Sequence, residues 1–290
     1  MLHIFLLLLL MTGIPVDSGA DSLDTNNNEI TLDRVEVQQY GMDLIDMAFI
    51  DEYKLENLMD NLEEAVYRNA EDARFDKDGK IIGEELGATL DRQEFRNLFR
   101  ELYYNENKGK LTVPKTAVYP KVNRGLLKEI SMLELGRYVT SFKQSNLERS
   151  HNIDLASEAI NNTVIFPGET FSFNQVVGER TAERGYKKAP VIVKGELAED
   201  IGGGICQVSS TLYNAVDLKG IQIVERYAHS RQVPYVPPGR DATVSWWGPD
   251  FVFKNLYNEP ILIRAKSESG QMVVTLYSSD TVEYFNGNAD

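Results

Sequence analysis

The single cysteine of the chain, Cys206, lies two residues after a run of three glycines, Gly202–Gly204. Three glycines disfavour the interior of a helix or strand, whereas the residues after them have the apolar spacing of a helix that ends near Gly220. Cys206 is therefore expected at the start of a helix, where unpaired backbone N–H groups and the helix dipole favour negative charge. This position lowers the pKa of a thiol and favours the nucleophilic thiolate.

The predicted helix has an apolar stripe, and Cys206 lies outside it. At 100° per residue the stripe contains Val208, Leu212, Ala215 and Val216, while Cys206 shares another arc with Ser209, Ser210 and Tyr213. A structural cysteine is expected in the core stripe, because free cysteines are usually buried. The arc therefore favours a reactive thiol, with Ser209 and Tyr213 beside it as candidate substrate contacts. Gly203 and Gly204 would let a substrate backbone approach closely.

A thiolate nucleophile needs a base or ion-pair partner, and the chain after its N-terminal segment contains two histidines. His151 precedes a predicted helix and is interpreted as an exposed residue. His229 follows a predicted strand and is the better candidate. Asp241 opens the next predicted strand, where it would orient the imidazole or bond its own turn backbone. Arg240 would hold a substrate carboxylate or form an ordinary salt bridge.

The composition argues against several classes of protein. The 290 residues carry a net charge of −14, which disfavours a nucleic-acid partner. One cysteine excludes an internal disulfide and a cysteine-rich zinc cluster. Arg74 occupies the first ligand position of an EF-hand-like spacing around Gly79, where calcium needs a carboxylate. We expect no metal and no cofactor. Trp246 and Trp247 could stack on sugar or pack in a core.

The elements that must position these residues predict two domains in an α+β chain. Acidic residues are denser before residue 130 than after it, and an apolar run at Ile4–Met11 ends in small residues. We expect a signal peptide at 1–20, a polar lead-in and helix at 21–69, a smaller α+β domain at 70–125, and a mostly antiparallel β domain with a few helices at 130–280. No other segment is apolar enough to span a membrane, so the mature protein is expected to be exported.

The periodicity and the turn residues divide the chain further. Helices are predicted at 53–69, 91–104 and 152–162, and 111–121 as an edge strand or linker. Strands are predicted around the turn at 78–79 and at 163–166, 170–173, 189–194, 221–226, 242–246, 251–254, 261–265 and 272–277.

Most of residues 135–266 resembles the VanW domain of Gram-positive bacterial envelope proteins. The matching segments follow one another in order: Asn161–Ile165, Pro167–Asn174, Gly178–Thr181, Glu183–Tyr186, Gly202–Asn214, Val224–Arg226, His229–Ser230, Tyr235–Pro237 and Gly239–Val244. Residues 70–125 resemble, more loosely, the peptidoglycan-binding domain that often precedes it, through Gly87, Leu90–Asp91 and Val113–Pro120.

The resemblance implies an L,D-transpeptidase of the cell wall in which Cys206 is the nucleophile. The partner would be a peptidoglycan stem peptide, and the product a 3→3 crosslink formed through a thioester. Backbone N–H groups near Gly204–Gln207 would stabilise the oxyanion. Two alternatives stay open: a wall-binding or assembly module without catalysis, in which Cys206 is a small packing residue, and a peptidase that uses water as acceptor. The oligomeric state stays open too.

Overall fold

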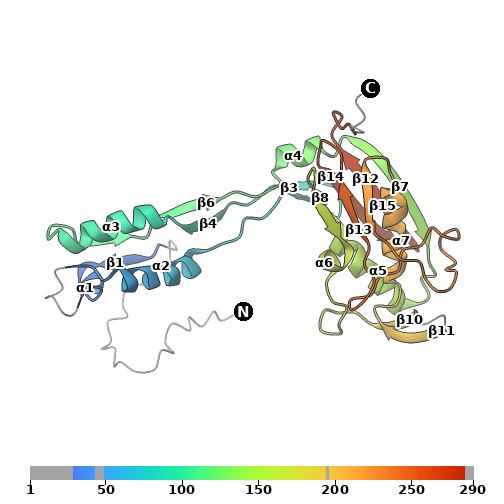
Figure 1. Cartoon of the computed structure of the whole chain (residues 1–290), viewed down its shortest axis with the longest axis horizontal. Coiled ribbons are helices and arrows are strands. Elements are labelled where there is room, and N and C mark those ends of the chain that lie inside the picture. Colours follow the sequence, from blue (N-terminus) through green and yellow to red (C-terminus); the bar gives the residue numbers. More distant parts are fainter. Residues whose placement is uncertain (1–28, 43–48, 194–195, 285–290) are drawn as a thin grey trace. The chain divides into compact units, whose positions relative to one another are not determined.

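The computed structural model describes residues 29–42, 49–193 and 196–284, which form two compact units (Figure 1). One unit contains the residues up to 71 together with 86–119, and the other contains 72–85 and the residues from 120 onward. The signal peptide predicted at 1–20 and the lead-in up to residue 28 lie outside the described residues. The domain limits drawn from the sequence stay predictions.

In the first unit two amphipathic helices pack around an apolar core. Asp51 and Asp91 cap them, because their side chains accept hydrogen bonds from first-turn N–H groups. Leu55 and Met59 of the first helix, and Phe95 and Phe99 of the second, are fully buried. The unit contains β1 (Thr31–Asp33), α1 (Arg34–Gln38), α2 (Glu52–Val66), β4 (Gly87–Leu90), α3 (Arg92–Tyr104), β5 (Lys110–Thr112) and β6 (Lys115–Val118). Strand β1 pairs with β5, and β4 pairs with β6, both antiparallel.

The second unit is built on two antiparallel sheets. The strand order is β7-β15-β14-β8 in one and β12-β13-β9 in the other, and β2–β3 and β10–β11 form separate hairpins. Its elements are β2 (Arg74–Phe75), β3 (Ile81–Ile82), α4 (Arg124–Glu129), β7 (Leu133–Ser141), α5 (Leu147–Ile160), β8 (Thr163–Ile165), β9 (Thr170–Ser172), α6 (Phe173–Val177), β10 (Lys188–Val193), β11 (Glu196–Ile201), α7 (Ile205–Val216), β12 (Ile221–Glu225), β13 (Val252–Asn255), β14 (Ile261–Glu268) and β15 (Gln271–Ser278).

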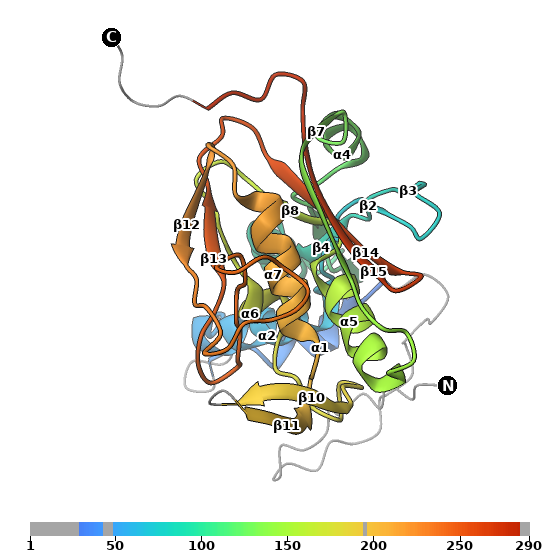
Figure 2. The same cartoon turned by 90° about the vertical axis from the view of Figure 1, so that its right-hand side faces the viewer.

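Helix α7 lies between the two sheets of this unit (Figure 2). Val208 and Leu212 are fully buried, and Tyr213 makes an edge-to-face contact with Phe251 at 5.7 Å between ring centroids. Both sheets and α7 contribute to one apolar core. The α+β class with mostly antiparallel strands is therefore confirmed.

The structure differs from the predicted secondary structure in several places. Helix α5 begins at Leu147 rather than at residue 152, with Asn146 as its cap, so His151 lies inside a helix. Strand β7 was not predicted, because Gly136 interrupts its apolar pattern. Residues 242–246 form no strand apart from one bridge between Tyr227 and Thr243. Within the described ranges, no helix is long and apolar enough to cross a membrane.

Candidate functional site

The glycine run turns the chain from β11 into α7 and brings Cys206 into the first turn of that helix. Gly204 is the N-cap and has a φ of +110°, a left-handed conformation that glycine adopts without strain. Gly203 is held by close packing, because a Cβ atom there would lie 2.5 Å from the carbonyl oxygen of Ala189. The helix start predicted from the sequence is confirmed to within one residue.

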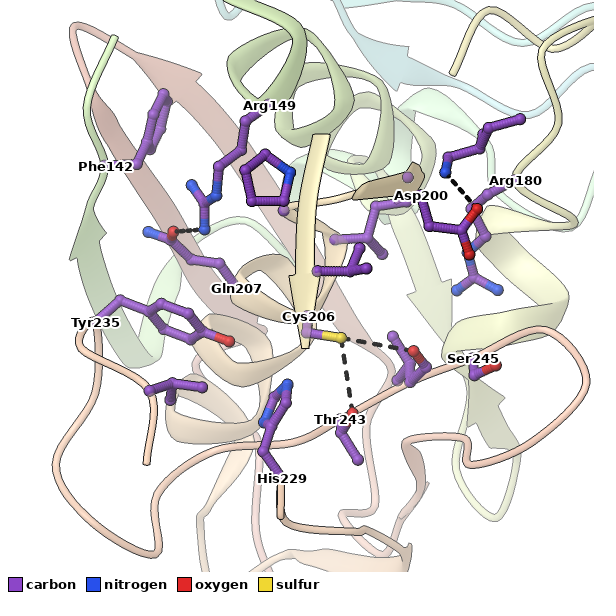
Figure 3. A pocket seen from close by; sticks show the side chains of 18 of the residues that line it. Phe142, Arg149, Arg180, Asp200, Cys206, Gln207, His229, Tyr235, Thr243 and Ser245 are labelled. Carbon is purple, nitrogen blue, oxygen red and sulfur yellow. Dashed lines mark hydrogen bonds between the residues drawn. The ribbon is translucent and has the colours of Figure 1, made fainter. Parts of the chain in front are cut away.

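His229 lies beside Cys206, and Asp241 lies beside His229, although all three are far apart in sequence. The His229 side chain lies beside the Cys206 thiol, whose pKa it lowers, and Figure 3 shows the imidazole ring directed toward the sulfur. The His229 Nδ1 atom lies 2.7 Å from Oδ2 of Asp241, and the His229 backbone N–H donates to the same oxygen at 2.6 Å. The structure thus brings together a thiol, an imidazole and a carboxylate.

The site favours a charged pair of Cys206 and His229. Burial raises the pKa of the Cys206 thiol, but the hydrogen bond and positive charge of His229 outweigh it, and the pKa lies below its usual value. Burial lowers the pKa of His229, but its interactions with Cys206 and Asp241 leave that pKa raised. Burial also raises the pKa of Asp241, and the two bonds from His229 bring it below its usual value. The shifts of Cys206 and His229 both act in the direction of a thiolate facing an imidazolium.

The polar arc of α7 fixes the segment that carries Asp241. The Ser209 hydroxyl donates to the Ala242 carbonyl at 2.6 Å, and the Ala242 N–H donates to the Ser210 hydroxyl at 2.9 Å. The Asn214 amide donates to the Arg240 carbonyl at 2.7 Å. These side chains take the place of a β ladder, which explains why the predicted strand at 242–246 is not formed.

Of the residues predicted to contact the substrate, one lines the pocket and the others lie outside its lining. Gly204 lines the pocket that contains Cys206, and Gly203 is buried behind it. Ser209 and Tyr213 are buried and lie outside the lining, and Tyr213 is sandwiched between the guanidinium groups of Arg226 and Arg240 at 4.6 and 4.8 Å. Arg240 is paired with Asp217 at 2.6 Å, also outside the lining. These three residues therefore support the site from behind.

The pocket in front of the thiol has a volume of about 990 Å³. The Cys206 sulfur lies 3.7 Å from the hydroxyl of Thr243 and 3.5 Å from the carbonyl oxygen of Val244. Arg149 lines one side and donates to Gln207 at 2.8 Å, and Arg180 lies on the other side (Figure 3).

Three aromatic residues also line the pocket. Tyr235 is the first, and burial raises the pKa of its hydroxyl. Trp246 and Trp247 also line the pocket, and Trp247 is 87% exposed. Arg149, Arg180 and Gln207 were not predicted as site residues, because no spacing in the sequence marks them. Within the described ranges, no group of three or more His, Cys, Asp or Glu side chains could hold a metal ion.

Comparison with known proteins identifies a family. Residues 148–277 match the family model described as VanW like protein. The chain is 52% identical over 262 residues to the uncharacterized protein YoaR of Bacillus subtilis. This alignment covers 90% of this chain and 86% of that protein. A shorter segment of 78 residues is 35% identical to the vancomycin B-type resistance protein VanW of Enterococcus faecalis, covering 27% of this chain and 28% of the relative. No solved structure matches significantly. The site thus lies within the matched region, and the chain belongs to the VanW family.

Proposed function

We propose that this protein acts at the cell envelope as a cysteine acyltransferase of the L,D-transpeptidase type, forming 3→3 crosslinks between peptidoglycan stems. One observation carries the proposal: a thiol in the first turn of α7 faces an imidazole whose Nδ1 atom is hydrogen bonded to a carboxylate, and the thiol lines a pocket large enough for a peptide. The relative named for vancomycin resistance supports the envelope as the place of action.

The first half of the reaction is acylation. The Cys206 thiolate attacks the carbonyl of the third stem residue, and a C–S bond forms as the C–N bond to the terminal D-alanine breaks. The leaving nitrogen takes its proton from the His229 imidazolium. Asp241 keeps Nδ1 protonated and directs the other ring nitrogen at the reacting atoms.

The oxyanion formed during acylation needs a donor in the first turn of α7. The amides of Ile205 and Gln207 already donate to the carbonyls of Gly202 and Gly204, at 3.2 and 3.0 Å. Within the segment Gly204–Gln207 the N–H groups of Gly204 and Cys206 have no such acceptor among the described residues, and of these we propose the N–H of the nucleophile itself, Cys206, as an oxyanion donor.

The second half resolves the thioester. The side-chain amine of another stem's third residue attacks the thioester carbon, its proton goes to His229, and the C–S bond breaks to restore the thiolate. Water in place of the amine would make the protein a peptidase. Trp246 and Trp247, at the pocket, offer apolar surface on which an incoming stem or sugar would pack.

The experiment is incubation of the mature protein with purified tetrapeptide-bearing muropeptides, followed by mass spectrometry. Dimers joined between two third residues, with release of D-alanine, support the proposal. Released D-alanine without dimers supports the peptidase. Absence of both, with the muropeptide still bound by Cys206→Ala protein, supports the binding module.

We further propose that the first unit contributes wall binding and takes no part in the chemistry, since the described residues that line the pocket all belong to the second unit. Hydrogen exchange of the full-length Cys206→Ala protein tests this proposal. Glycan-bearing muropeptides should protect amides in residues 49–71 or 86–119. Protection confined to the second unit would contradict it.

A further inference from the structure

The guanidinium of Arg180 contains donors that no group among the described residues satisfies. Both terminal nitrogens are buried and have no hydrogen-bond partner. Buried N–H donors without an acceptor are costly, and a ligand that accepts hydrogen bonds from them would remove that cost. Arg180 lines the same pocket as Cys206, so a ligand that pairs with it would also lie near the thiol.

The aliphatic part of the Arg180 side chain is held in place by packing. Its Cβ and Cγ atoms pack on Gly202, where an added Cβ atom would come within 3.2 Å, and its guanidinium lies over the ring of Phe173 at 5.7 Å from the centroid. Gly202 begins the turn that leads into α7, so the turn that positions the nucleophile also positions this arginine. Planar guanidinium groups recognise carboxylates through two parallel hydrogen bonds.

The other arginines near the site are already engaged. Arg149 donates to Gln207, whose amide group in turn donates to Thr140 and Ser141. Arg240, the residue that the sequence suggested for a carboxylate, pairs with Asp217 and Asn214 outside the pocket. The acidic groups near Arg180 include Asp250, whose carboxylate accepts bonds from Ser172 and Asn174, and Glu179 and Asp200, which line the same pocket.

We infer that Arg180 is the specificity-determining residue that binds the free C-terminal carboxylate of the peptide donor. This inference rests on the proposed function and refines it: the donor must end one residue beyond the carbonyl that Cys206 attacks. The leaving residue would then lie between the thiol and Arg180, where the guanidinium rotates toward the pocket and gains its missing partner. Longer stems would place an amide, which carries no charge, at this position.

The test measures binding without turnover. Full-length protein carrying Cys206→Ala is titrated calorimetrically with a tetrapeptide stem that has a free C-terminal carboxylate, and with the same peptide as its C-terminal carboxamide. We expect the carboxylate to bind roughly 10- to 100-fold more tightly, the range typical of a charge-assisted pair. Adding Arg180→Gln should abolish this preference, and Arg180→Lys should retain part of it.

The control is Arg231→Gln, which removes the same charge from an exposed residue outside the pocket lining and should leave the preference intact. Thermal unfolding provides a second readout. Arg180→Gln should keep or raise the Tm of the ligand-free protein, because it removes an unpaired buried charge. A carboxylate preference that survives Arg180→Gln, no measurable preference in the Cys206→Ala protein, or a large fall in Tm with the preference unchanged would overturn the inference.

Turnover of the otherwise unmodified protein is measured separately. An Arg180-dependent preference without dimers or released D-alanine would refute the proposed function and leave the carboxylate site standing. Turnover with a preference independent of Arg180 would refute only this inference.

Discussion

Replacing Asp241 with asparagine should raise the pKa of the Cys206 thiol. Asp241 Oδ2 accepts two hydrogen bonds from His229, from the ring at 2.7 Å and from the backbone at 2.6 Å. Asparagine retains a neutral acceptor but removes the charge that favours the imidazolium. A hydrogen bond to a charged group contributes about 1.5–3 kcal/mol, and one pKa unit corresponds to about 1.36 kcal/mol. Losing the charge of Asp241 makes the imidazolium less favourable, and the pKa of the Cys206 thiol should therefore rise by about one to two units.

The assay is the rate of iodoacetamide alkylation as a function of pH. Only the thiolate reacts, so below its pKa the rate falls tenfold per unit. In the unsubstituted protein the rate should begin to fall at a pH below the usual thiol value of about 8.5. Asp241→Asn should shift this limb upward by about one to two units and slow alkylation by about 10- to 100-fold at pH values below the limbs of both proteins.

The control is Asp217→Asn, which removes a carboxylate that pairs with Arg240 outside the pocket. Its alkylation profile should match that of the unsubstituted protein. An unchanged profile in Asp241→Asn would show that the carboxylate does not act on the thiol through His229, and would refute this reasoning.

Four further outcomes are expected. Cys206→Ser should abolish activity with a change in stability well below the 2–5 kcal/mol of a core truncation, measured by thermal unfolding; a loss of that size would favour a packing role. His229→Ala should slow both acylation and transfer by about 10²- to 10⁴-fold in single-turnover kinetics, and an unaffected rate would exclude it as the acid–base group. Gly203→Ala should cost about 1–3 kcal/mol in denaturant unfolding, because its Cβ would meet the Ala189 carbonyl, whereas Gly109→Ala, where the space is open, should cost far less. The pKa of Asp241 is lowered in the folded state, so its stabilising contribution is present above about pH 4 and is lost as the pH falls through that lowered pKa. The loss of stability caused by Asp241→Asn should therefore become smaller in acid. A loss of stability that does not depend on pH would contradict this sign.

The chemistry of the site could be predicted only as far as local patterns reach. The glycine run and the helical spacing after it indicated that Cys206 starts a helix, and the scarcity of histidines pointed to His229. Neither pattern shows that the fold brings His229 beside Cys206. Arg149 and Arg180 look like surface residues in the sequence, because nothing local shows that the fold buries part of each against the pocket.

The errors in secondary structure have physical causes that involve residues distant in sequence. Gly136 interrupts the pattern of β7 because α7 passes so close that a Cβ atom there would lie 2.5 Å from the Ala215 carbonyl. The alternation at 242–246 is that of a strand, but the hydroxyls of Ser209 and Ser210 take the backbone groups of Ala242. The same contacts explain why Ser209, predicted to face the substrate, is buried. A helical wheel separates the apolar face of α7 from its polar face, but it does not show that another segment of the chain covers the polar face.

The side-chain hydrogen bonds between α7 and residues 240–242 should also decide which part of the second unit unfolds first on heating. Cys206 belongs to a helix enclosed between two sheets, whereas His229 and Asp241 lie on chain that no continuous ladder secures. Segments held by a few such bonds open at lower free energy than the core around them. Detachment of this segment would separate the imidazole from the sulfur while both sheets stay intact. We therefore expect the proposed activity to be lost below the global melting temperature and to return on cooling, because this segment is held by bonds from Ser209, Ser210, Asn214 and Arg226.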